Sequence, residues 1–146
     1  MAALTLGACG GRPPSPAPAP AVGARRAGDL ALADSLGDLI TESIRADARL
    51  EPADSLYSPG ALFVADGHRR TEPPRFAGVE PGGQVAITSM EITITRAQAW
   101  AAVEYRWFSI RDNIVREAQA TVVFAPAAGR TGNPWRITHL HSSIAR

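Results

Sequence analysis

The sequence predicts an α+β domain in which one long amphipathic helix packs on a curved antiparallel sheet. Two observations support this class. Residues 29–48 carry apolar side chains at steps of three and four, which is the period of a helix with one buried face. After residue 60 the period changes to two, and four long strand patterns follow with short turns between them. Such strands pair as an antiparallel meander, and the helix then has a sheet face to cover.

The first 28 residues are predicted to lie outside this domain, which we expect to span residues 29–146. The segment Leu6-Gly7-Ala8-Cys9 resembles a bacterial lipobox, the end of a lipoprotein signal, in which the cysteine is lipidated. Residues 10–27 are rich in Pro, Ala and Gly, a composition typical of an extended spacer. The expectation is a domain tethered to the bacterial cell envelope through Cys9, with no other membrane contact. The alternative is an accidental match, an untethered tail and a cytoplasmic protein.

The predicted helix begins near Asp29, a plausible N-cap, and cannot continue past Glu51 because Pro52 follows. A short helical turn is expected around residues 53–57. The apolar stripe of the helix consists of Leu32, Leu36, Leu39, Ile40 and Ile44.

The strands are predicted at residues 61–66, 85–97, 99–110, 114–126 and 135–145. Residues 67–83 have the Pro and Gly content of a loop. Tight turns are expected at Asp112-Asn113 and at residues 129–134.

Composition excludes several classes of function. The 146 residues carry a net charge of +1, with 15 basic and 14 acidic residues that are dispersed along the chain. Nucleic-acid binding needs basic residues clustered on one face, so no nucleic-acid partner is expected. The single cysteine permits no internal disulfide, and no zinc-binding spacing occurs. We therefore expect neither a metal nor another cofactor.

The end of the chain carries a more specific pattern, W-x-I-x-H-x-H-S, formed by Trp135, Ile137, His139, His141 and Ser142. With the order of helix, short helical piece, strand and meander, it resembles the nuclear transport factor 2-like superfamily, especially its SnoaL-like branch. The last strand is also similar to that of the association domain of calcium/calmodulin-dependent kinases. Residues 54–63 are similar to the family segment that joins the helix to the first strand.

This resemblance implies a cone-shaped domain in which the helix and the curved sheet enclose a pocket. Such families include isomerases, cyclases, dehydratases, epoxide hydrolases and proteins that only bind or assemble, so fold does not decide function. Two departures matter. Many relatives have a further helix where this chain has the loop 67–83, which predicts a more open pocket mouth. Kinase association domains carry an anion-binding arginine near the position of Thr121, so an equivalent anion site is not expected there.

The two histidines of the last strand have two interpretations. Trp135, Ile137, His139 and His141 alternate along one strand, so a regular strand would turn all four toward the interior of the cone. Imidazoles there could move protons or bind a ligand. The plainer interpretation, which we favour, is one hydrogen-bonded core histidine and one at a subunit contact.

Asp66, at the end of the first strand, is the best acid–base candidate by position, although an Asp before Gly67 more commonly forms a turn. Glu104 and Arg106 share a face and are interpreted as a surface pair rather than pocket residues. The side chains predicted to line a ligand pocket are Tyr57, Tyr105, Trp107, Thr121, His139 and His141.

The leading functional hypothesis is a non-catalytic domain that binds a small, partly apolar ligand or acts as an interaction module. The alternative is a cofactor-free isomerase, dehydratase or hydrolase with Asp66 and His139 as acid and base. A third possibility is a purely structural oligomer. A homodimer is expected in each case, because relatives often pair through the sheet face.

Overall fold

The computed structural model describes residues 27–127 and 135–145. Cys9, the lipobox, most of the proposed tether and the predicted turn at 129–134 lie outside these residues. The element order is α1 (Ala27–Arg49), the 3-10 turn η1 (Asp54–Leu56), β1 (Tyr57–Ala65), β2 (His68–Arg70), β3 (Gln84–Ile94), β4 (Ala99–Ser109), β5 (Ile114–Pro126) and β6 (Trp135–Ile144). The predicted helix and the strands of the meander are therefore present, within a few residues of their expected bounds.

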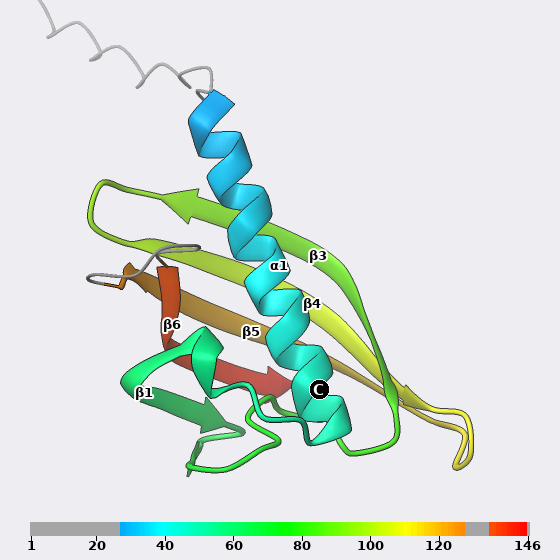
Figure 1. Cartoon of the computed structure of the whole chain (residues 1–146). Helices are drawn as coiled ribbons and strands as arrows, with labels where there is room; N and C mark the ends of the chain where they lie inside the picture. The colour runs from blue at the N-terminus through cyan, green and yellow to red at the C-terminus, as the bar shows by residue number, and fades with distance from the viewer. Residues whose placement is uncertain (1–26, 128–134, 146) are drawn as a thin grey trace, which may run out of the picture.

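The strands form one curved sheet in the order β2-β1-β6-β5-β4-β3, and α1 lies across one face of it (Figure 1). The meander from β3 to β6 is antiparallel, as predicted. β1, however, pairs with β6 in parallel, so the sheet is mixed rather than wholly antiparallel. The whole meander separates these two strands in the chain, so no tight turn constrains their relative direction.

The helix packs on the sheet through the predicted stripe, with Leu36, Leu39, Ile40 and Ile44 all buried. Gly37 faces β3 at a point where a Cβ would already touch the sulfur of Met90. α1 ends in two backbone hydrogen bonds, from Leu50 N to Asp47 O and from Glu51 N to Ala46 O. These are the two bonds of a Schellman motif, and they require Leu50 to adopt a left-handed conformation.

β1 turns back into the short strand β2, which the sequence analysis had included in the loop 67–83. Both turn residues have positive φ, 51° for Asp66 and 78° for Gly67. This is the pattern of a type I′ hairpin turn, for which Asp-Gly is a favoured sequence. The chain after β2, residues 71–83, packs against the inner side of the sheet through the buried residues Phe76, Ala77 and Val79.

A β-bulge interrupts β6 and changes which side chains face the core. Phe124 pairs with Ile137 but Val123 pairs with His139, so Thr138 is an extra residue on β6. Before the bulge Trp135 and Ile137 are buried, and after it Leu140 and Ser142 are buried. The prediction that Trp135, Ile137, His139 and His141 share a buried face is therefore wrong.

The core fills the space between α1 and the sheet face that it covers. Its largest fully buried side chains from the sheet include Tyr105, Phe124, Ile137, Leu140, Val103 and Val122. Within the described residues, no helix is long and apolar enough to cross a membrane.

Candidate functional site

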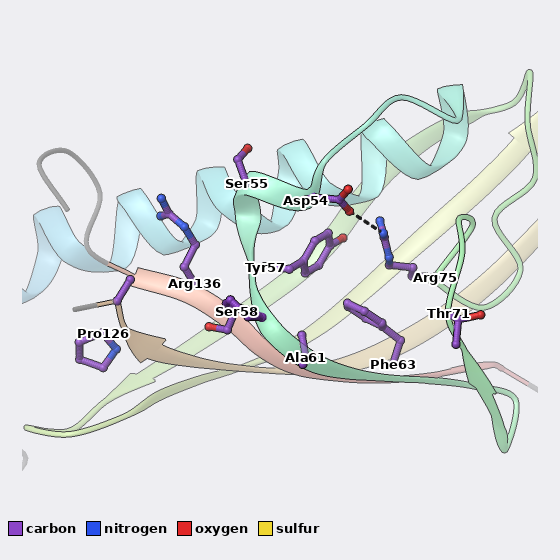
Figure 2. Close-up of a pocket in the computed structure, with 13 residues that line it drawn as sticks. Asp54, Ser55, Tyr57, Ser58, Ala61, Phe63, Thr71, Arg75, Pro126 and Arg136 are labelled. Atoms are coloured by element: carbon purple, nitrogen blue, oxygen red, sulfur yellow. Dashed lines mark hydrogen bonds and ion pairs between the residues drawn. The ribbon is translucent and has the colours of Figure 1, made fainter. Parts of the chain in front are cut away.

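A cavity of about 890 Å³ opens where η1 leads into β1. Its walls come from η1 and β1, from Thr71 and Arg75 in the segment after β2, and from Pro126, Ala127 and Arg136 near the adjoining ends of β5 and β6. Figure 2 shows Tyr57, Phe63 and Arg75 gathered on the side of the cavity beneath α1. A volume of this size accommodates a small organic molecule.

An irregularity in β1 creates this opening. Tyr57 pairs with Ile137 and Leu62 pairs with His139, so residues 58–61 of β1 lie opposite the single residue Thr138 of β6. The excess chain bends away from the sheet at Gly60, which has a φ of 76°. Ser58, Pro59, Gly60 and Ala61 consequently form a wall of the cavity instead of a regular ladder.

Arg75 is the only described cation buried in this wall, with 8% of its side chain exposed. Its guanidinium carbon lies 4.7 Å from the ring centroid of Tyr57 and 5.0 Å from that of Phe63. The two rings meet edge to face, with centroids 4.9 Å apart. Cation–π contacts of this kind stabilise a positive charge that has left water.

One edge of the guanidinium is paired and the other is not. Arg75 Nη2 donates to Asp54 Oδ1 at 3.0 Å, drawn as the dashed line in Figure 2. The other two guanidinium nitrogens, Nε and Nη1, are buried and have no hydrogen-bond partner among the described residues. Buried donors of this kind are uncommon, and each one left unpaired is costly.

Asp47, near the end of α1, holds the backbone of Arg75 in place. Its Oδ2 accepts hydrogen bonds from the backbone N–H of Arg75 and, at 2.8 Å, from that of Phe76. Burial raises the pKa of the Asp47 carboxyl above its ordinary value, while the two N–H bonds and the charge of Arg75 act against the rise. Asp47 Oδ1 has no partner among the described residues.

Tyr57 completes this polar cluster. Burial, and then the negative charge of Asp47, raise the pKa of the Tyr57 hydroxyl, so it stays protonated at neutral pH. The hydroxyl interacts electrostatically with Arg75 and Ser43, but among the described residues it makes no hydrogen bond of ordinary geometry. Tyr57 lines the cavity, in agreement with the prediction from the sequence.

The arrangement is suited to binding an anion. A fixed guanidinium packs beside two aromatic rings at a partly apolar wall, and its only ion-pair partner among the described residues, Asp54, has a side chain that is 87% exposed. Guanidinium groups bind carboxylates through directed, charge-assisted hydrogen bonds. Among the described residues, no group of three or more His, Cys, Asp or Glu could hold a metal ion.

The two histidines do not lie at this cavity. The bulge at Thr138 turns His139 and His141 to the outer face of the sheet, where His141 is exposed and His139 is half-buried. His141 lies in a shallow outer groove of about 420 Å³ together with Glu91, Glu104 and Thr121. Thr121 pairs directly with His141, so it also lies on the outer face and not at this cavity.

Asp66 forms a turn, the more common role weighed for it from the sequence. Its side chain is exposed, its N–H donates to Ser142 O at 2.9 Å, and its Oδ1 accepts from Ile144 N at 2.9 Å. These bonds tie the β1–β2 turn to the end of β6. Neither Asp66 nor His139 lines the cavity, so the proposed acid–base pair is not assembled there.

Tyr105 and Trp107 face the interior, as expected, but they hold the loop before β3 and do not line the cavity. The Tyr105 hydroxyl donates to Ala77 O at 2.7 Å, and Trp107 Nε1 donates to Glu80 O at 2.9 Å. Arg106 pairs with Glu117 on the exposed outer face, and Glu104 is also exposed there. The surface interpretation of Glu104 and Arg106 is thus confirmed.

Arg75, Asp47 and Asp54 are not among the site residues predicted from the sequence. Asp47 carried a usable signal, because it lies three residues after Ile44 and seven after Ile40, on the buried stripe of the helix. A charged residue at a stripe position indicates a buried polar contact. Arg75, within a Pro-rich segment, had no comparable signal.

The architecture is similar to that of several solved structures. No family model and no curated protein sequence match the chain. Among solved structures, a nuclear transport factor 2-like superfamily protein from Salmonella enterica aligns with a TM-score of 0.60 at 13% identity, covering 81% of this chain and 94% of that one. A candidate ketosteroid isomerase from Shewanella frigidimarina aligns with a TM-score of 0.57 at 17% identity, covering 77% and 94%.

A third structure is a candidate calcium/calmodulin-dependent protein kinase II association domain from Xanthomonas campestris. It aligns with a TM-score of 0.52 at 16% identity and covers 88% of this chain and 93% of that one. Identities this low establish a shared architecture and carry no activity over to this chain. The helix on a curved, unclosed sheet and these alignments together show that the chain has the nuclear transport factor 2-like fold.

Proposed function

We propose that this domain binds a small, partly apolar organic anion in the cavity at Arg75. The observation that carries the proposal is the buried guanidinium at the cavity wall, which packs beside the rings of Tyr57 and Phe63 and, among the described residues, is ion-paired only with the exposed carboxylate of Asp54. Because the Asp54 carboxylate is exposed, this ion pair contributes little to stability.

Three features support an anion with an apolar body. Arg75 Nη2, which donates to the exposed Asp54 carboxylate, offers a donor for the carboxylate of a ligand. Arg136, at another part of the cavity wall, adds positive charge. Pro59, Ala61 and Pro126 supply apolar surface for the rest of the molecule.

The test is calorimetric titration of the full chain with benzoate, an aromatic monoanion, and with benzamide, its neutral counterpart. Benzoate is expected to bind, and Arg75→Lys is expected to weaken its binding by about tenfold because the planar donor fork is lost. Benzamide should bind more weakly than benzoate to the unchanged chain.

Arg116→Lys is the matched control, because Arg116 is also stacked on an aromatic ring, 4.8 Å from the Trp107 centroid, but lies away from the cavity. It should leave benzoate affinity unchanged. Equal affinity of the Arg75→Lys variant and the unchanged chain, with both folded by circular dichroism, would refute the proposal.

We also propose that the cavity works at a bacterial envelope, with the domain held there through Cys9. The lipobox-like segment ending at Cys9 and the Pro/Ala-rich residues 10–27 support this location. In a bacterial host, the chain should take up labelled fatty acid and partition into detergent, and Cys9→Ser should abolish both. Unlabelled chain in the aqueous phase would instead indicate an accidental match.

A further inference from the structure

The ion pair at the cavity joins one fixed partner to one loosely held partner. Arg75 has 8% of its side chain exposed, whereas the Asp54 side chain is 87% exposed, although Nη2 and Oδ1 are 3.0 Å apart. Both residues line the cavity. If a ligand breaks this ion pair, the Asp54 carboxylate is the partner that can move away, because Arg75 is buried.

Arg75 is fixed from two sides. Asp47, near the end of α1, accepts a hydrogen bond from its backbone N–H, and its guanidinium packs against the rings of Tyr57 and Phe63. Among the described residues, the Asp54 side chain makes one hydrogen bond, that from Nη2, and Asp54 stands at the first position of η1. An exposed carboxylate bound in this way shifts an equilibrium by no more than about fivefold.

We infer that Asp54 is a built-in competitor, a carboxylate of the chain that occupies the place of the ligand's carboxylate and is displaced when the ligand binds. This inference rests on the proposed function and extends it in two ways. It names the ligand's acidic group as a carboxylate, because that is the group the chain itself presents to Nη2. It also assigns Asp54 the role of lowering the affinity of the cavity for its ligand, since the ligand must displace the Asp54 carboxylate to bind.

Displacement has a consequence for specificity. A carboxylate ligand exchanges one carboxylate for another at Nη2 and adds the contacts of its apolar body with the cavity wall. A neutral ligand must either leave the Arg75–Asp54 pair intact or break it without compensation. Asp54 therefore discriminates against neutral molecules of the same shape, which is a form of selection by competition.

The experiment measures the dissociation constants of benzoate, benzamide and inorganic phosphate for the full chain and three variants. Asp54→Asn removes the competing charge and keeps the side-chain shape. Asp54→Glu keeps a competing carboxylate. Glu91→Gln removes one negative charge from the outer sheet face, so it controls for the change in net charge.

Asp54→Asn is expected to bind benzoate about threefold to fivefold more tightly than the unchanged chain. Asp54→Glu and Glu91→Gln should stay close to the unchanged chain. Asp54→Asn should increase the affinity for benzamide less than the affinity for benzoate, because benzamide carries no charge for Arg75 to bind. Phosphate should bind more weakly than benzoate to every variant.

Other outcomes overturn the inference in distinguishable ways. If Asp54→Asn leaves benzoate affinity unchanged or lowers it while Arg75→Lys weakens binding, the anion site stands and the competitor role fails. If phosphate binds more tightly than benzoate, the assignment of a carboxylate fails. If Glu91→Gln gives the same gain as Asp54→Asn, the effect is one of net charge. If neither benzoate nor phosphate binds the unchanged chain or any variant, the proposed function fails and this inference fails with it.

Discussion

Asp47 and Arg75, 28 residues apart in the chain, are joined by a hydrogen bond from the backbone N–H of Arg75 to the Asp47 carboxylate. The same carboxylate oxygen accepts the N–H of Phe76 at 2.8 Å. Through these two bonds the last turns of α1 determine where the segment after β2 presents its guanidinium. The cavity therefore depends on the packing of the helix as well as on the residues that line it.

Removing the Asp47 carboxylate should destabilise the fold. Asp47→Ala leaves two buried N–H groups without an acceptor, and we expect a loss of about 2–4 kcal/mol in the free energy of unfolding. Asp47→Asn keeps an acceptor oxygen and should lose less. Urea unfolding at neutral pH measures both variants, and an alanine variant within about 0.5 kcal/mol of the unchanged chain would contradict the assigned role.

The same carboxyl predicts a pH dependence of stability. Because burial raises the pKa of Asp47 in the folded chain above its ordinary value of 3.8, the folded state binds this proton more tightly than the unfolded state does. Its contribution to stability is present in full below the ordinary value and is lost as pH rises through the raised folded value. The stability of the unchanged chain relative to Asp47→Asn should therefore decrease as pH rises above about 4.

Urea unfolding of both proteins across that range provides the measurement. Taking the difference between them cancels the titration of the other carboxyl groups, which the two chains share. A difference that grows with pH would mean that hydrogen bonding and the charge of Arg75 outweigh burial, and that the folded pKa lies below the ordinary value.

Leu50 offers a stabilising change. It adopts a φ of 54° in the Schellman motif that ends α1, a position where glycine is usual, and 51% of its surface is exposed. Leu50→Gly removes the strain of the left-handed conformation at little cost in packing, so stability should rise by about 0.5–1 kcal/mol. Leu50→Ala keeps the Cβ and should give no such gain. Thermal unfolding of the two variants measures the difference. Equal melting temperatures would show that the left-handed conformation of Leu50 does not strain the chain.

How well each part could be predicted depends on how local its cause is. The stripe from Leu36 to Ile44 and the alternation in the strands are local patterns, and both predicted real elements. The Asp66-Gly67 turn was also local, and a turn was the more common role weighed for Asp66, but the dipeptide's hairpin signal was not used to predict the strand β2 that follows.

The rest is non-local. One extra residue, Thr138, reverses the faces of His139 and His141, and the period of two cannot reveal it because the bulge is defined by pairing with β5. The contact between Asp47 and Arg75 likewise exists only after α1 and the segment after β2 have packed together. The polar residues of the candidate site were missed for this reason, and of the side chains predicted to bind a ligand, Tyr57 is the one that lines this cavity.

The orientation of the histidines leads to a last prediction. Because His139 and His141 lie on the outer face and neither lines the cavity, His139→Gln and His141→Gln should leave benzoate affinity within about twofold of the unchanged chain. Arg75→Lys, measured in the same titrations, should weaken it by about tenfold. A loss confined to the histidine variants would move ligand binding to the outer groove, where His141 lies with Thr121 and Glu104. In that case the interior guanidinium would serve the packing of the segment after β2, and the paired histidines near the end of the chain would be the binding residues.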